Sequence, residues 1–80
     1  MKDLKELLFE KTYRTRVSLQ TSDDIVAETI LEGEDGFYES TERNNILSRF
    51  MGFWDLIEEC ELVDEYETYL NANGYNDEIQ

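Results

Sequence analysis

The spacing of apolar residues changes early in the chain, from a helical period to an alternating one. Leu4, Leu7 and Leu8 stand at i, i+3 and i+4, which predicts a short amphipathic helix over residues 2–10. Apolar and polar residues then alternate over 13–19, the pattern of a half-buried strand. Because a helix this short is unstable alone, we expect it to pack against a neighbouring element.

Turn signals divide the next part of the chain into strands. Residues 21–24 predict a turn, since their Ser and Asp side chains can bond to their own backbone. The β-branched stretch 24–32 predicts a second strand with apolar side chains on both faces. Asp35-Gly36 signals a tight hairpin that leads into a short strand over 37–39. These elements predict a three-stranded antiparallel meander.

From Ser40 onward the apolar period returns to 3.6 residues, so the second half of the chain is expected to be helical. A helix capped by Ser40 or Thr41 is expected to break at Gly52, and residues 53–60 continue as a turn or short helix. The apolar face of this helix consists of Ile46, Leu47, Phe50 and Met51.

The last predicted helix carries the clearest amphipathic stripe of the sequence. Its apolar positions are Leu62, Val63, Tyr66, Tyr69 and Leu70. Gly74 is suited to the position just beyond its end, and residues 75–80 are expected to form a frayed tail. Together the elements predict one α+β domain over residues 1–80 in the order α-β-β-β-α-α, with a three-stranded antiparallel meander and helices packed on one face.

Charge limits the kinds of partner that the protein can bind. The 80 residues include 20 acidic and 7 basic side chains, for a net charge of −13, and no base follows Arg49. Direct binding to nucleic acid or to an anionic membrane is not expected, because both require Lys and Arg to neutralise phosphates. A partner with a basic surface is the remaining electrostatic option.

The sequence also indicates a compartment. Residues 1–11 mix charges with leucines, so we expect neither a signal peptide nor a membrane span, and we place the protein in the cytoplasm. Cys60 is the sole cysteine, which excludes an intramolecular disulfide and suits a reducing environment. Acidic neighbours should keep its thiol unreactive, so we expect Cys60 to be a small buried hydrophobe.

The residue types needed for most catalysis are missing from the sequence. The chain contains no histidine, which removes the usual general base and the commonest metal ligand. Without an activating partner for Ser, Thr or Cys, we expect no catalytic residues and no enzymatic activity. A calcium loop placed around Gly74 has Tyr69 and Gln80 where carboxylates are required. We therefore expect no metal site and no cofactor.

The acidic side of the last helix is the main candidate for a functional surface. Glu61, Asp64 and Glu65 lie opposite the apolar stripe, at spacings that put neighbouring residues about 5–6 Å apart. One interpretation is solubility, which net negative charge promotes. The other is that these carboxylates stand in for DNA phosphates in a basic cleft, which would attract them at a steered, salt-dependent rate.

Several short stretches, taken in order, resemble a known family. They are Asp3-Leu4, Tyr13 to Leu19, Asp35-Gly36 with Tyr38, Glu39-Ser40, Phe50, Trp54 and Asp64-Glu65-Tyr66. With the predicted element order, over residues 3–70, they resemble the small acidic type II-A anti-CRISPR proteins, of the Listeria prophage type that mimics the PAM duplex.

This resemblance implies a function and a set of binding residues. The function is that of a non-catalytic inhibitor that occupies the PAM-reading, DNA-binding cleft of a CRISPR-associated nuclease loaded with guide RNA, and so blocks target DNA. In the family, acids of the hairpin and of the final helix contact the arginines that read the PAM guanines. Carried over, the partner-binding residues are Glu34, Asp35, Tyr38, Glu58, Glu59, Glu61, Asp64, Glu65 and Glu67.

The residues leave two alternatives open. The protein could be an acidic interaction module that binds another basic protein, as an antitoxin, an immunity protein or a regulatory subunit does. If the acids serve solubility alone, a homodimer face could form from Phe53, Trp54, Tyr66 and Tyr69. A monomer is the expected oligomeric state.

Overall fold

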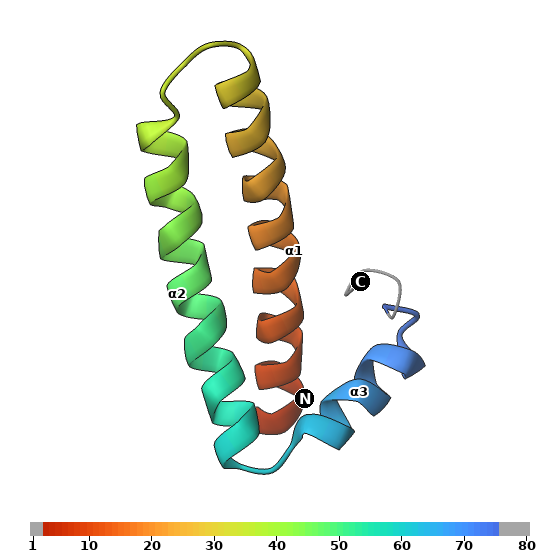
Figure 1. Ribbon diagram of the computed structural model, residues 1–80. Coiled ribbons are helices and arrows are strands. Elements are labelled where there is room, and N and C mark those ends of the chain that lie inside the picture. The colour runs from red at the N-terminus through yellow and green to blue at the C-terminus, as the bar shows by residue number, and fades with distance from the viewer. Residues whose placement is uncertain (1–2, 76–80) are drawn as a thin grey trace.

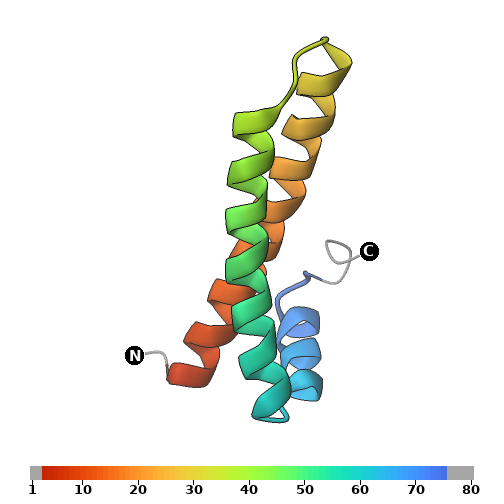
Figure 2. The ribbon, with the colours of Figure 1, turned by 60° about the vertical axis from the view of Figure 1, so that its left-hand side comes forward.

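The computed structural model describes residues 3–75, which form three α-helices: α1 (Leu4–Leu31), α2 (Phe37–Glu59) and α3 (Val63–Ala72). α1 and α2 run side by side in opposite directions as a long hairpin (Figure 1). α3 lies at the end of the hairpin where α1 begins and α2 ends, as a second view also shows (Figure 2). The molecule is elongated, with axes of 44, 23 and 22 Å.

The predicted α+β fold with the order α-β-β-β-α-α is wrong, because residues 3–75 contain no strand. The expected strand over 13–19 lies entirely within α1. The expected strand over 24–32 forms the end of the same helix and its C-cap, and the expected turn at 21–24 is helical. The packed meander is therefore replaced by one long helix.

The second half of the prediction is wrong in two further places. The expected third strand, 37–39, is the first turn of α2, so Asp35-Gly36 connects two helices rather than two strands. The expected break at Gly52 is absent, because α2 continues through this glycine to Glu59. The helical character predicted after Ser40 is correct.

A seam of buried and partly buried side chains explains why α1 is helical throughout. On α1 the seam residues recur at alternating spacings of four and three: Leu8, Thr12, Thr15, Leu19, Ser22, Val26 and Thr29. On α2 and its N-cap the same spacing gives Gly36, Ser40, Arg43, Leu47, Phe50, Trp54 and Ile57. This is the period by which two helices pack along a common line. Arg43 Nε donates a hydrogen bond to Asp23 Oδ1 at 2.6 Å, which joins the two helices in register.

The hairpin seam changes character along its length. Toward α3 it contains the bulky side chains of Phe50, Trp54 and Ile57, whereas near the loop it contains small polar residues such as Ser22 and Ser40. Since the stabilisation from burial scales with apolar area, the two helices are held together mainly at the α3 end.

The core lies at this α3 end, where all three helices meet. Its buried residues are Phe9, Ile57, Tyr66 and Leu70. The Phe9 and Tyr66 rings lie 5.4 Å apart between centroids, and Tyr75 stacks on Tyr13 at 3.9 Å beside them. The stripe predicted for the last helix is confirmed, because Tyr66 and Leu70 are the buried residues of α3.

Several residues expected in the interior are exposed instead. Leu4 is 85% exposed, and α1 packs into the core through Phe9 and Leu8. Cys60, expected to be a buried hydrophobe, is exposed at the corner between α2 and α3. Conversely, the expected homodimer face is largely used within the monomer, since Tyr66 is 5% exposed and lies in the core.

The three helices end in the same way, with a Schellman motif. The amide of the second residue past each C-cap donates to a carbonyl five residues earlier: Glu34 to Thr29, Leu62 to Ile57, and Tyr75 to Leu70, at 3.2, 2.8 and 2.9 Å. The left-handed residue of each motif is Gly33, Glu61 or Gly74, with φ of 91°, 57° and 72°. Glycine suits this conformation because it lacks a β-carbon, so Glu61 is the exception.

The ends of the described chain are also defined. Asp3 caps α1 close to the predicted start, with its Oδ1 accepting the Glu6 amide at 2.8 Å. Of the tail expected to fray, Tyr75 packs against the core and 76–80 lie outside the described residues. Within residues 3–75, no helix combines the length and apolar character that crossing a membrane requires.

Candidate protein-binding site

The nine residues predicted to bind a partner do not form one site. Glu34, Asp35 and Tyr38 lie at the loop end of the hairpin, at the top of Figure 1. The other six form the α3 acidic surface at the opposite end: Glu58, Glu59, Glu61, Asp64, Glu65 and Glu67. Between the two groups, the 23 residues of α2 span about 34 Å. The structure therefore replaces one predicted surface with two.

Three acids of the α3 acidic surface lie where the fold disfavours them. Glu58 and Glu59 occupy the last turn of α2, an end at which the helix already carries about half a negative charge. Glu61 follows in the left-handed conformation that suits glycine. All three are exposed, and no base among residues 3–75 forms an ion pair with them. Their presence is not explained by the fold.

Asp64 and Glu65, by contrast, have a structural role. They lie in the first turn of α3, where the helix dipole favours a carboxylate by about 0.3–1 kcal/mol. Glu65 also pairs with Lys5 at 3.0 Å, which connects α3 to α1, and this hydrogen bond raises the pKa of the Lys5 ammonium. Both side chains are about half exposed, so the pair adds little to stability.

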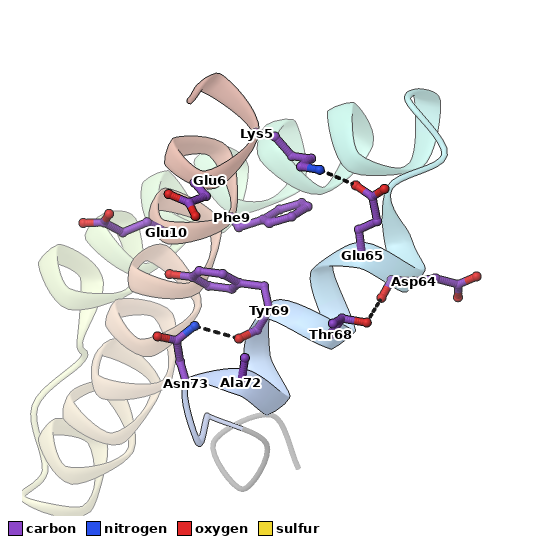
Figure 3. A pocket seen from close by; sticks show the side chains of 10 residues that line it. All are labelled: Lys5, Glu6, Phe9, Glu10, Asp64, Glu65, Thr68, Tyr69, Ala72 and Asn73. Atoms are coloured by element: carbon purple, nitrogen blue, oxygen red, sulfur yellow. Dashed lines mark hydrogen bonds and ion pairs between the residues drawn. The ribbon is translucent and has the colours of Figure 1, made fainter. Parts of the chain in front are cut away.

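A cleft of about 680 Å³ separates α3 from the first turns of α1 (Figure 3). The rings of Phe9 and Tyr69 line it, 5.6 Å apart between centroids. Carboxylates from both helices also line it: Glu6 and Glu10 from α1, and Asp64 and Glu65 from α3. The cleft thus combines aromatic faces with a concentration of negative charge.

This combination suits a Lys or Arg side chain, whose stem can lie against the partly exposed Tyr69 ring while its cationic head meets the carboxylates. One such head group is already present, because Lys5 Nζ pairs with Glu65 at the cleft (Figure 3). Glu10 pairs with Arg14 at 2.8 Å, whereas no base of the described chain forms an ion pair with Asp64. The cleft can therefore accept a further basic side chain from a partner.

The α1 side of the cleft was missed by sequence reasoning, which assigned the site to the last helix and the hairpin. Glu6, Phe9 and Glu10 stand at i, i+3 and i+4, so they share one face of a helix. The spacing was visible, but nothing in the sequence indicated that this face lies opposite α3.

Neither metal-binding geometry nor homology adds to this picture. Among residues 3–75, no three His, Cys, Asp or Glu side chains come together to hold a metal ion. No protein-family model, curated protein or solved structure matches the chain. The function is therefore inferred from the charge and geometry of the site itself.

Proposed function

We propose that this protein is a non-catalytic inhibitor that binds the DNA-binding cleft of a nucleic-acid enzyme in place of DNA. The observation that carries the proposal is the placement of Glu58, Glu59 and Glu61, which are exposed at positions that the fold disfavours. Replacing them should stabilise the protein, so their presence is best accounted for by a partner that binds them. A cleft rich in Lys and Arg is a partner of the required charge.

The α3 acidic surface approaches the charge density of DNA. Asp64, Glu65 and Glu67 place three carboxylates on four consecutive residues, about 6 Å of helix axis, with Glu65 and Glu67 on opposite sides of α3. Each strand of duplex DNA carries one charge per about 3.4 Å of axis. A basic cleft that encloses α3 would therefore meet carboxylates on both sides of the helix. Attraction of this kind accelerates association and weakens as salt rises.

The specific target we propose is the PAM-reading cleft of a type II CRISPR-associated nuclease loaded with guide RNA, in the cytoplasm of a bacterial host. The support is the resemblance to type II-A anti-CRISPR proteins, which now rests on residue pattern alone, because helices replace the predicted meander. Within Asp64-Glu65-Tyr66 the acids are exposed and the tyrosine is buried. The two acids would therefore be the groups that meet the PAM-reading arginines.

A competition assay tests this proposal. A guide-loaded type II nuclease is mixed with a fluorescent duplex that contains a PAM, and DNA binding is followed by anisotropy as the purified protein is added. We expect the protein to displace the duplex, and the inhibition to weaken between about 50 and 200 mM salt. Full DNA binding at low salt and a large molar excess of the protein would exclude this target. The same assay with other DNA-binding enzymes tests the broader proposal.

Two variants of equal net charge separate a specific surface from a general charge effect. The first combines Glu58→Gln, Glu59→Gln and Glu61→Gln. The second combines Ser18→Lys, Asn45→Lys and Ser48→Lys, at exposed positions along the middle of the hairpin. Each raises the net charge of −13 by three. The first should weaken inhibition about tenfold or more, whereas the second should leave it nearly unchanged. Equal losses would mean that net charge alone governs binding.

A second candidate function is that of an acidic module that binds a different basic protein, such as a toxin. The cleft between α1 and α3 favours this function, because its aromatic lining fits a Lys or Arg side chain inserted from a protein surface. A pull-down from bacterial lysate with the wild type and the triple Gln variant separates the candidates. Recovery of a toxin or a ribosomal protein by both would favour the second, since the variant leaves the cleft residues unchanged. Recovery of a DNA enzyme by the wild type alone would favour the first.

A further inference from the structure

We propose that the loop end of the hairpin is a second docking surface, which binds a basic amphipathic helix of a protein partner. This surface, named the hairpin tip, comprises residues 28–42: the end of α1, the loop and the first turns of α2, at the top of Figure 1. It lies at the opposite end of the hairpin from the α3 acidic surface. The inference does not rest on the function proposed above.

Large apolar side chains are open to solvent at the hairpin tip. Ile30, Leu31, Phe37 and Tyr38 are 55%, 87%, 75% and 66% exposed. Leu31 and Phe37 flank the loop, and Ile30 lies against it, since its Cγ1 would be 3.5 Å from a β-carbon on Gly36. Phe37 and Tyr38 alone expose on the order of 200–350 Å². That area is comparable with the apolar patches of about 300–600 Å² that often mark interaction sites on monomers.

The fold does not require these side chains to be apolar. The core around Phe9 and Ile57 lies at the other end of the hairpin, and the hairpin seam near the tip is made of small and polar residues. Tyr38 is held outward, with its hydroxyl donating to Glu42 Oε1 at 2.9 Å. Polar substitutions at the tip should therefore leave the helices intact.

The charge around this patch selects its occupant. The hairpin tip, residues 28–42, holds six acids and no Lys or Arg. None of these six acids forms an ion pair with a base of residues 3–75. Two tips meeting would bring their negative charges together, and an anionic membrane would repel the tip, so neither is the favoured occupant. A partner helix with apolar residues at helical spacing, flanked by Lys and Arg, matches both the exposed apolar side chains and the negative charge of the hairpin tip.

A designed peptide tests the inference on the full-length protein. The probe is a helix of about 18 residues with leucines at i, i+3 and i+4 and lysines elsewhere, titrated into isotope-labelled protein and followed by NMR. We expect saturable shifts of amides in residues 28–42. A peptide of the same composition in scrambled order, which lacks an apolar face, should bind at least about tenfold more weakly.

Variants at the two ends of the hairpin provide a matched comparison. Leu31→Ser with Phe37→Ser should weaken peptide binding at least about tenfold, because it removes two apolar anchors. Leu4→Ser is the control, since Leu4 is 85% exposed but lies at the α3 end, and it should change the affinity by less than about twofold. Circular dichroism reports whether each variant keeps its helices. If the double variant unfolds, Glu32→Gln with Glu39→Gln tests the same surface through its charge.

Several outcomes would overturn the inference. They are amide shifts that map to the α3 acidic surface, or a scrambled peptide that binds as tightly as the designed one. A loss of peptide affinity from Leu4→Ser equal to that of the double variant would also overturn it. A concentration-dependent dimer that Phe37→Ser abolishes would show that a second copy covers the patch, and binding to neutral vesicles in place of the peptide would show a lipid surface. The two proposals fail separately: the triple Gln variant should bind the peptide normally, and the Leu31→Ser, Phe37→Ser variant should still compete with DNA.

Discussion

Replacing Glu61 by glycine should stabilise the protein by about 1 kcal/mol. Glu61 is left-handed, with φ of 57°, where the matching positions after α1 and α3 are Gly33 and Gly74. This conformation costs a residue with a β-carbon about 1–2 kcal/mol. The freedom of glycine in the unfolded chain offsets about 0.4–1 kcal/mol of the gain. The net effect corresponds to a rise in Tm of about 4–8 °C for a domain of this size.

Urea denaturation followed by circular dichroism measures the change, with Glu61→Ala as the matched control. Both substitutions remove the same charge near Glu58 and Asp64, but alanine keeps the β-carbon. The alanine variant should therefore stay within about 0.5 kcal/mol of the wild type. If it were as stable as the glycine variant, the gain in stability would come from removing the negative charge. The left-handed backbone of residue 61 would then not be its cause. A glycine variant less stable than the wild type would contradict the left-handed conformation of residue 61 itself.

Three further predictions concern the core and the hairpin. Ile57→Ala, at a fully buried position, should lower the free energy of unfolding by about 2–5 kcal/mol in urea titrations, and Leu56→Ala, next to it but 47% exposed, should cost clearly less. Burial raises the pKa of Tyr66 to about 12, so the folded protein holds this proton more tightly than the unfolded chain, where the tyrosine pKa is about 10. This contribution to stability should be complete below pH 10 and be lost as pH rises from about 10 to 12, and Tyr66→Phe should reduce the loss in alkaline unfolding curves. A double-mutant cycle on Asp23 and Arg43 should give a coupling of about 0.2–1 kcal/mol, because the pair is partly exposed, and a coupling near zero would mean that it does not hold the register.

The last helix could be predicted because its local signals agree. Tyr66 and Leu70 recur at helical spacing, and Gly74 lies just past the end, where a left-handed residue is needed. The start of α1 was likewise predicted closely, from the spacing of Leu4, Leu7 and Leu8. In each case the deciding residues lie within one or two turns of one another, so the sequence displays them directly.

The first helix was predicted too short because its seam uses polar residues. Thr15, Ser22 and Thr29 lie between the helices, at positions where an analysis of hydrophobic spacing expects Leu or Ile. The alternation over 13–19 and the β-branched stretch 24–32 favour strands locally, but this preference depends on context, and packing against α2 overrides it. Small polar residues at four–three spacing were the signal for one continuous helix.

The acidic character of the site was predictable, but its division into two surfaces was not. The division depends on how far α2 runs, and therefore on Gly52. A glycine inside a helix costs about 1 kcal/mol relative to alanine, a penalty that the packing of Phe50 and Trp54 on either side can exceed. The separation of Glu34 from Glu58 thus follows from tertiary packing.

The position of the core at one end of the hairpin has a consequence for how the chain acquires its structure. Contacts near the loop join residues close in sequence but involve small side chains, whereas Phe9 and Ile57, about fifty residues apart, meet in the core. A long loop must close before the main stabilisation is gained, which slows folding. On the ribosome, the first two helices emerge before Tyr66 and Leu70 of α3 can pack on them. Stable folding should therefore wait until α3 has been synthesised, because α3 completes the core into which Phe9 of α1 packs.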